Sequence, residues 1–252
     1  MTLSVVFGMT GSNVQRYLYF VRQILLRVLA NHPAAAIRLP TAEKIQEYQA
    51  AVEERHPMLE NVWCCFDGLQ LEIECNGDQD TQRQFFNTSC KSSHFVMSLL
   101  VFCPDGTIPI AVFNVPGCVH DSKIATIGGV YDKLENIYNE FGAISVGDSA
   151  FCASKGDFVI RSSSRDREGG QSQFNIQATS LRQASEWGMR AIQASFPRLK
   201  DVVKLEDFGE RGYIMHVMLL LHNLRARKVG INQIRSTYMD YLNDNPELYF
   251  DI

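Results

Sequence analysis

Three acidic residues, far apart in the chain, lie where their carboxylates could act together. Asp67 ends the apolar run 62–66, and Asp148 ends a second run at 144–147. Glu186 lies in a stretch with a helical pattern. Two aspartates at strand ends and one glutamate on a helix are the parts of a site that holds two divalent cations for phosphodiester chemistry.

The chemistry of such a site explains the need for several carboxylates. Cleaving a phosphodiester requires charge to be neutralised on both the attacking and the leaving oxygen, and two cations about 3.5–4 Å apart can do both. Hard cations such as Mg²⁺ take oxygen ligands, so the fold must bring several carboxylates together. Gly68 and Gly147 stand beside the two aspartates. Without side chains, they would let a metal or a substrate backbone approach closely.

Each acidic residue also has a simpler interpretation. An aspartate before glycine is common in turns, and an aspartate at a strand end can cap the backbone there. Glu186 could form ion pairs with Arg182 or Arg190, which stand four residues away on either side. Asp121 is a further candidate acid, but it could equally cap the segment that follows it.

The composition is that of a globular protein large enough for a sizeable core. The 252 residues are 46% hydrophobic and 21% charged, which fits one large domain. The longest apolar runs are too short to cross a bilayer, and the N-terminus has no signal-peptide pattern. Seven scattered cysteines without a Cys-x-x-Cys pair indicate reduced thiols and an intracellular location.

The charge is unevenly distributed along the chain. The net charge of −4 gives no general support for nucleic-acid binding. Residues 151–235, however, hold 14 Lys/Arg and 8 Asp/Glu, a net of +6, so the remainder carries −10. This basic part follows Asp148 and surrounds Glu186, so it could equally contact phosphates or form an ordinary solvated face.

The elements that must position these residues follow from the hydrophobic periodicity. Strands are expected at 62–66, 69–75, 94–102, 108–113, 144–146 and 158–161. Helices are expected at 10–31, 41–56, 130–141, 180–196 and 207–228. Loops are expected at 76–84 and 163–173, and Pro104-Asp105-Gly106 indicates a hairpin. Strands followed by a crossover and flanking helices give an α/β or α+β domain.

Several short motifs, in a fixed order, resemble one family. They lie at residues 66–69, 84–87, 102–108, 114–122, 147–151, 178–190, 196–200 and 221–227. The most characteristic read Phe-Asp-Gly-Leu, Pro-Gly-Cys-Val-His-Asp-Ser and Gly-Asp-Ser-Ala-Phe. Together, over about residues 60–230, they resemble the catalytic domain of PIF/Harbinger-type transposases, which are DDE superfamily endonucleases.

This resemblance implies a fold, an activity and a set of site residues. The fold would be α/β and RNase H-like, with a central mixed sheet flanked by helices and a short N-terminal helical region. Asp67, Asp148 and Glu186 would be the catalytic and metal-binding triad, holding Mg²⁺ or Mn²⁺ to cleave and join DNA at transposon ends. The expected phosphate-binding residues are Lys155, Arg161, Arg182, Arg190 and Lys200.

The same resemblance sets the expected organisation and partners. Residues 1–60 would be a helical remnant of a helix-turn-helix, 61–235 the catalytic domain and 236–252 a C-terminal tail. Asp121 comes too early in the order to replace Asp148, so we expect a structural or secondary role for it. Family members are nuclear and can work with a separate Myb-like DNA-binding protein. For this protein, DNA is the expected partner and a homo-oligomer is one possible state.

Two other functions fit the sequence. The protein could be a domesticated or relic transposase that has kept the fold and binds DNA or protein without catalysis, because 7–16 resembles only the second half of a helix-turn-helix. It could also be an RNase H-like nuclease that acts on RNA–DNA hybrids. Metal binding separates the first alternative from the endonuclease, and substrate competition separates the second.

Overall fold

A six-stranded mixed sheet forms the centre of the molecule. The computed structural model describes residues 3–74, 78–87, 93–151, 156–162, 173–199 and 208–239. The strands are β1 (Val62–Glu72), β2 (Phe86–Asn87), β3 (Ser93–Phe102), β4 (Ile110–Pro116), β5 (Ile144–Asp148) and β6 (Val159–Ser162). β1 pairs antiparallel with β3 and parallel with β5, while β6 continues the parallel side beyond β5. β3 also pairs antiparallel with β4 and, near its start, with β2.

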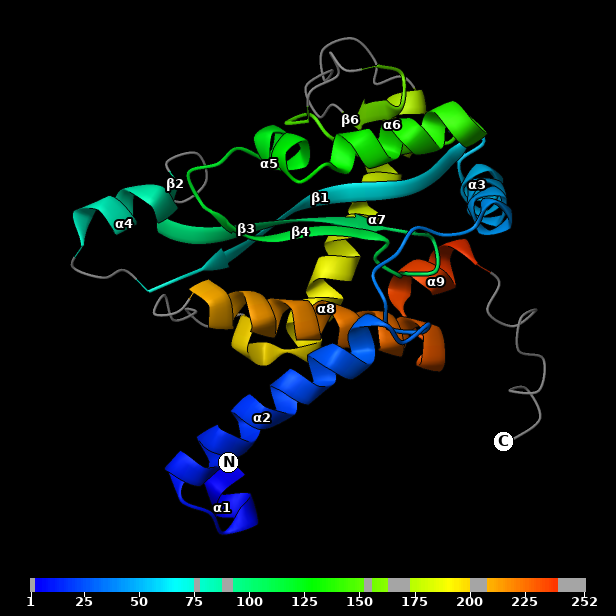
Figure 1. Cartoon of the computed structure of the whole chain (residues 1–252). Coiled ribbons are helices and arrows are strands. Elements are labelled where there is room, and N and C mark those ends of the chain that lie inside the picture. The colour runs from blue at the N-terminus through cyan, green and yellow to red at the C-terminus, as the bar shows by residue number, and fades with distance from the viewer. Residues whose placement is uncertain are drawn as a thin grey trace, which may run out of the picture.

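Helices cover both faces of this sheet (Figure 1). One face carries α5 (Asp121–Ile127) and α6 (Val130–Phe141), and the other carries α7 (Gln173–Ser195) and α8 (Phe208–Val229). α3 (Ala42–Arg55) and α9 (Gln233–Tyr238) pack at one end, and α4 (Gln79–Phe85) lies near β2 and β3. The expected central mixed sheet flanked by helices is therefore confirmed.

The first part of β1, residues 62–66, is buried on both faces, as its continuous apolar run predicts. Cys65, Leu69 and Leu71 pack into a core that includes residues of α7 and α8. Trp63 and Phe66 pack into a second core with residues of α5 and α6. The strand thus separates two hydrophobic layers, and its side chains are held from both sides.

The structure corrects the position of Asp67. The sequence predicts a strand that ends at this residue, but β1 runs without a break from Val62 to Glu72. The reason is the long antiparallel pairing with β3, which extends from Cys65 to Glu72 and carries the strand through Gly68. Asp67 is therefore a mid-strand residue, whereas Asp148 is the last residue of β5.

The other expected elements are mostly present. The hairpin of β3 and β4 and helix α6 are confirmed, and Thr10 and Thr41 cap α2 (Gly11–Ala30) and α3 through their side-chain oxygens. Two expectations are wrong. The stretch 76–84 contains α4, and α7 begins at Gln173, before the capping pattern at Ser180. The loop at 163–172 and the tail from residue 240 lie outside the described residues.

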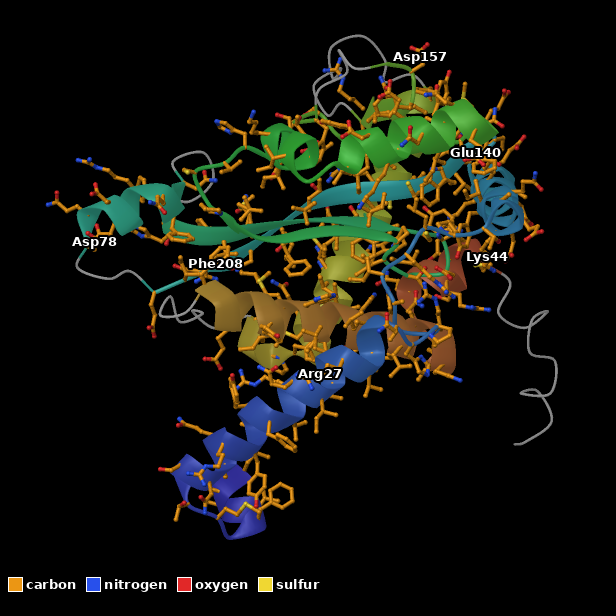
Figure 2. All side chains as sticks on the ribbon, viewed as in Figure 1. Arg27, Lys44, Asp78, Glu140, Asp157 and Phe208 are labelled. Carbon is orange, nitrogen blue, oxygen red and sulfur yellow. The ribbon has the colours of Figure 1, made fainter. Side chains whose placement is uncertain are left out.

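An N-terminal arm extends away from the sheet (Figures 1 and 2). It consists of α1 (Leu3–Phe7) and α2, and the C-terminal part of α2 packs on α8 near Leu29 and Leu220. Arg22 of the arm forms an ion pair with Glu210 of α8 at 2.6 Å. Among the described helices, including this arm, none combines the length and the apolar character needed to cross a membrane.

Candidate active site

Two neighbouring parallel strands position the candidate aspartates. β1 and β5 pair so that Cys65 lies opposite Val146. Asp67 and Asp148 each follow these residues by two positions. Since side chains in a strand alternate with a period of two, both carboxylates belong to the sheet face that Cys65 and Val146 bury against α7.

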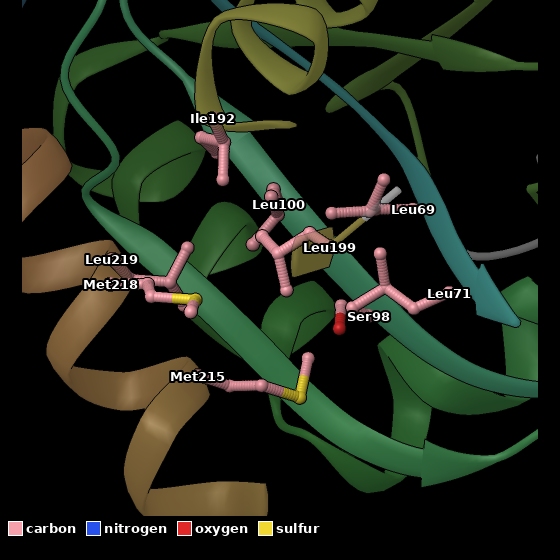
Figure 3. A pocket seen from close by; sticks show the side chains of 9 residues that line it. All are labelled: Leu69, Leu71, Ser98, Leu100, Ile192, Leu199, Met215, Met218 and Leu219. Carbon is pink, nitrogen blue, oxygen red and sulfur yellow. The ribbon is translucent and has the colours of Figure 1, made fainter. Parts of the chain in front are cut away.

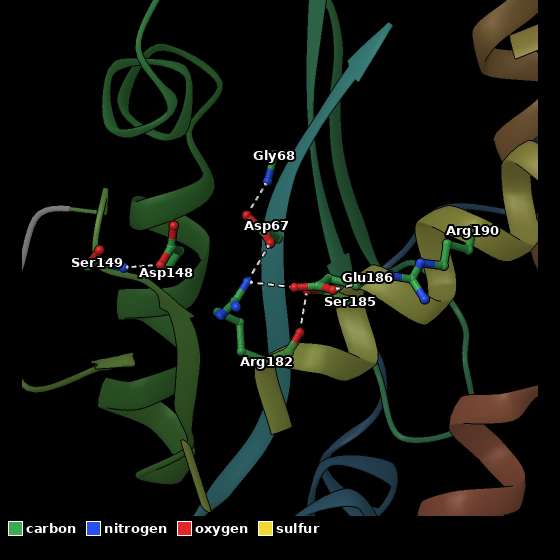
Figure 4. A network of polar contacts seen from close by, with 8 residues as sticks. All are labelled: Asp67, Gly68, Asp148, Ser149, Arg182, Ser185, Glu186 and Arg190. Carbon is green, nitrogen blue, oxygen red and sulfur yellow. Dashed lines mark hydrogen bonds and ion pairs between the residues drawn. The ribbon is translucent and has the colours of Figure 1, made fainter. Parts of the chain in front are cut away.

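Helix α7 supplies the third acid together with a cation. α7 crosses β1, β3 and β5, and its apolar stripe packs into the sheet. One guanidinium nitrogen of Arg182, Nη1, lies 3.1 Å from Oδ2 of Asp67 and 3.2 Å from Oε1 of Glu186 (Figure 4). Arg190 approaches Glu186 more loosely, at 3.8 Å. Arg182 therefore links the strand acid to the helix acid.

The expected ion pairing of Glu186 is thus present, alongside its position in the candidate triad. Arg182 stands one turn before Glu186 and Arg190 one turn after it, which is the i, i+4 geometry. The turn interpretation of Asp67, by contrast, is wrong because the residue lies within β1. Ser185, fully buried next to Glu186, donates a hydrogen bond to the carbonyl oxygen of Arg182 at 2.6 Å.

Asp67 lies in an environment that opposes its charge. Burial raises the pKa of Asp67 to about 6, and the charges of Asp148 and Asp121 add to the rise. The backbone N–H of Gly68, which donates to Oδ1 of Asp67 at 2.8 Å, and the guanidinium of Arg182 act in the opposite direction on this pKa. An acid whose pKa is raised by burial and by like charges is a candidate for a functional site.

Asp121 is a fourth acid near Asp67, on the side of β1 that α5 covers. It begins α5, and its carboxyl group packs on Gly68, where an added Cβ would come within 2.9 Å of Oδ1. This Oδ1 is buried and has no hydrogen-bond partner in the described part of the chain. Burial raises the pKa of Asp121, and the charge of Asp148 adds to the effect. The site therefore has more negative charge than its arginines balance.

The two glycines have other neighbours than expected. A Cβ on Gly147 would lie 2.6 Å from the ring of Phe66, and a Cβ on Gly68 would meet Asp121. The structure therefore explains Gly147 by close packing against an aromatic ring. Gly68 leaves room for a carboxylate, not for a substrate backbone.

The expected phosphate-binding residues have different surroundings. Arg182 is mostly buried between the acids, whereas Arg190 is exposed on α7. Arg161 is exposed on β6, where it pairs with Gly147 in the sheet. Lys155 and Lys200 lie outside the described residues. Of the five expected residues, the structure describes three, and of these Arg161 and Arg190 are exposed.

The carboxylate oxygens of the three acids suit a hard cation, although they are not arranged around a common point. Within the described ranges, no three His, Cys, Asp or Glu side chains form a ready-made metal-binding group. The oxygens of Asp67, Asp148 and Glu186 are nevertheless the ligands that Mg²⁺ and Mn²⁺ take. Burial raises the pKa of Asp67, the charges of Asp148 and Asp121 add to the rise, and Arg182 offsets it only in part, so the negative charge here is not fully compensated. The three acids are therefore chemically suited to a divalent cation, which requires that Arg182 moves away from Asp67 and Glu186.

Other residues of the motifs stabilise the connection between β3 and β4. Asn223 of α8 is fully buried; its side chain accepts a hydrogen bond from the Ile108 N–H at 2.7 Å and donates to the Ile108 carbonyl at 2.9 Å. His222 lies 3.0 Å from the carbonyl oxygen of Gly106. Tyr48 donates to Asp105 at 2.7 Å, and the other oxygen of Asp105 accepts from the Thr107 hydroxyl. These contacts tie the β3–β4 connection to α8 and α3.

The fold and the family agree. A mixed sheet with helices on both faces, and acidic side chains on two parallel strands and on a crossing helix, is the architecture of an RNase H-like α/β protein. A family model described as DDE superfamily endonuclease matches residues 66–223, which is more than half of the chain. The chain belongs to this family. Comparison with curated proteins found no match, and comparison with solved structures found none either.

Proposed function

We propose that this protein is a metal-dependent DNA endonuclease of the transposase type. The observation that carries the proposal is the convergence of Asp67 and Glu186 on one guanidinium nitrogen, 3.1 and 3.2 Å away. Asp148 lies near enough for its charge to raise the pKa of Asp67. Asp67 of β1 is thus linked to Glu186 of α7 through Arg182 and to Asp148 of β5 through the interaction of their charges.

In this proposal Asp67, Asp148 and Glu186 hold the divalent cations, Mg²⁺ or Mn²⁺. When bound, these cations supply charge stabilisation for the attacking and leaving oxygens of the phosphodiester. The Gly68 N–H orients Asp67 through Oδ1, and Ser185 anchors the turn of α7 that carries Glu186. Arg161 and Arg190 are exposed and are available to bind DNA phosphates.

The family subtype and its DNA substrate are inferred from the sequence motifs. The order of Phe66-Asp67-Gly68, the 114–122 motif and the Glu186 helix resembles PIF/Harbinger transposases. By this resemblance the DNA substrate is a transposon end, the reaction includes joining of a 3′-hydroxyl to target DNA, and the protein acts in the nucleus. A Myb-like partner and a homo-oligomer belong to the same proposal.

The test is cleavage of DNA that carries the matching element ends, with Mg²⁺ or Mn²⁺ and with EDTA. Asp67→Asn and Glu186→Gln should each lower cleavage by a factor of about 100 or more, because electrostatic stabilisation of the transition state is lost. Glu140→Gln on the exposed end of α6 is the matched control and should cleave like the wild type. Equal activity of wild type, Asp67→Asn and Glu186→Gln would overturn the proposed function.

One observation favours the non-catalytic alternative, a relic that binds without cleaving. Arg182 occupies the space between Asp67 and Glu186, and no metal-binding group of three is assembled among the described residues. A relic would bind DNA without responding to divalent cations. Calorimetry with millimolar Mg²⁺ or Mn²⁺ separates the two: heat of binding to the folded wild type, lost in Asp67→Asn, supports the endonuclease.

A further inference from the structure

Arg182 contacts both acids with a single nitrogen atom. Its Nη1 contacts Asp67 and Glu186, and its side chain is 21% exposed beside an Asp67 side chain that is 17% exposed. Arg190 reaches Glu186 only, at 3.8 Å, and its side chain is 75% exposed. The two arginines are therefore a natural pair for comparison, since only one of them lies inside the site.

The oxygens that Arg182 holds are those that a divalent cation would need. Oδ2 of Asp67 and Oε1 of Glu186 face the guanidinium. An arginine side chain keeps its charge at every physiological pH, so it cannot leave the site by losing a proton. Because two cations repel each other at such short range in a poorly solvated site, the guanidinium must move when a divalent cation takes these oxygens.

We infer that Arg182 is the internal counter-ion of the metal-free site and that divalent cations bind by displacing it from Asp67 and Glu186. The inference rests on the proposed function, because it assumes that these carboxylates bind metal. Arg182 is in this sense a positioning residue: it holds Asp67 and Glu186 together before the metal arrives. Its flexible side chain is anchored one turn from Glu186 on α7, so it can swing away without any change in the helix.

The displacement makes Arg182 a thermodynamic competitor of the metal. Removing the competitor should strengthen metal binding, because the cost of breaking two ion pairs disappears. It should also weaken the metal-free protein, because two partly buried carboxylates then lose their cation. A residue with only a structural role would produce the second effect without the first.

The experiment is calorimetric titration of the full chain with Mn²⁺ at low ionic strength. Arg182→Gln should bind Mn²⁺ at least about fivefold more tightly than the wild type, which is the lower range of site–site coupling. Arg182→Lys retains the charge and should stay close to the wild-type Kd, whereas Arg190→Gln loses only the loose contact to Glu186 and should change the Kd less than Arg182→Gln does. In EDTA, Arg182→Gln should melt at a lower temperature than the wild type, and Mn²⁺ should raise its melting temperature by more.

A second measurement observes Arg182 directly in the wild-type protein, and a variant serves only to assign its signal. In the ¹⁵N spectrum of wild-type arginine side chains, the ion-paired guanidinium signal of Arg182, assigned with Arg182→Lys, should lose its protection as Mg²⁺ is added. An unchanged Arg182 signal at saturating Mg²⁺, or equal Mn²⁺ affinity of Arg182→Gln and wild type, would overturn the inference and leave the proposed function standing. Absence of Mn²⁺ binding to wild type and Arg182→Gln alike would overturn both.

Discussion

Asp67 and Asp148 lie at equivalent positions of two hydrogen-bonded parallel strands, each two residues beyond the paired residues Cys65 and Val146. Their carboxylates therefore belong to the same face of the sheet, and their charges interact. Glu186 reaches the same region from α7, which lies across these strands. The site depends on how closely this helix approaches the sheet.

Gly188 sets that approach. A Cβ at Gly188 would come within 2.3 Å of the ring of Phe102 on β3. Gly188→Ala should destabilise the fold by about 1–3 kcal/mol through overpacking, although alanine favours a helix. It should also push the helix turn that carries Glu186 away from β1. Urea denaturation measures the first effect.

The exposed Gln183 on the same helix provides the control. Gln183→Ala should leave the free energy of unfolding within about 0.5 kcal/mol of wild type. Combining Gly188→Ala with Phe102→Leu should restore part of the loss, because the smaller side chain makes room for the methyl group. If the double variant is as unstable as the sum of the two single variants, the contact does not explain Gly188.

The titration of Asp67 should be visible in the stability of the protein. Its pKa is raised from 3.8 to about 6 in the folded state, mainly by burial. The folded state then holds the proton more tightly, so this contribution to stability is greatest below pH 3.8 and is lost as the pH rises toward 6. Asp67→Asn removes this loss. The variant should therefore gain stability relative to wild type across that window, by at most about 3 kcal/mol.

The measurement is the free energy of unfolding of both proteins between pH 4 and pH 7.5 in EDTA. Only the difference between them is informative, because other groups titrate in the same range. Burial lowers the pKa of His222, for example, and that contribution has the opposite sign. A difference that falls or stays constant as the pH rises would show that Asp67 does not titrate as described.

Ser98 offers a test of the core between β3, α7 and α8. Its hydroxyl is buried and has no hydrogen-bond partner among the described residues. It borders an apolar void of about 10 Å³ lined by Leu69, Met215 and Leu219, among others (Figure 3). Such a void barely admits one water molecule. Ser98→Ala should therefore be neutral or stabilise the protein by about 1 kcal/mol, since it removes an unsatisfied polar group.

Ser185 is the matched comparison for Ser98. Both hydroxyls are buried, but that of Ser185 donates to the Arg182 carbonyl oxygen. Ser185→Ala should lower the free energy of unfolding by about 1 kcal/mol. Thermal denaturation of the two variants gives the answer. The packing described for Ser98 is contradicted if its replacement costs as much as that of Ser185.

Asn223 should contribute strongly to stability and not to chemistry. Its amide satisfies both backbone groups of Ile108 in the β3–β4 connection. Asn223→Ala should cost about 3 kcal/mol or more, because it leaves a buried N–H and a buried carbonyl without partners. Asn232→Ala, which removes the cap of α9 and one hydrogen bond to the Asp105 carbonyl oxygen, should cost less, about 1–2 kcal/mol. Comparable losses in both variants, measured by urea denaturation, would show that Asn223 is not the main link.

Much of the fold could be predicted from periodicity and capping. The alternating pattern of Leu69, Leu71 and Ile73 correctly indicates one buried face, and the Pro104-Asp105-Gly106 turn indicates the hairpin. The predicted ends of some helices and strands were wrong. β1 continues past Asp67 because of its pairing with β3, and α7 begins seven residues before Ser180. Both depend on tertiary contacts that a local pattern does not contain.

The candidate site was only partly predictable. The motifs indicate which acids to examine, and the i, i+4 spacing indicates the ion pairs of Glu186. The contact between Arg182 and Asp67 spans 115 residues of sequence, so no local pattern predicts it. Asp121 was expected to be structural or secondary. Its carboxylate lies beside Gly68, next to Asp67 in the chain, and its membership in the 114–122 motif was the available signal.

The most direct test of the central claim is a crystal structure of the full chain grown with Mn²⁺, using the anomalous signal of the metal. We expect a Mn²⁺ peak bound by the carboxylates of Asp67 and Asp148, with metal–oxygen distances of about 2.1 Å, and Arg182 moved away from Asp67. Asp67→Asn crystals should lose this peak. A wild-type structure without Mn²⁺ at these carboxylates, with Arg182 still joining Asp67 to Glu186, would show that Asp67 and Asp148 do not form a metal site.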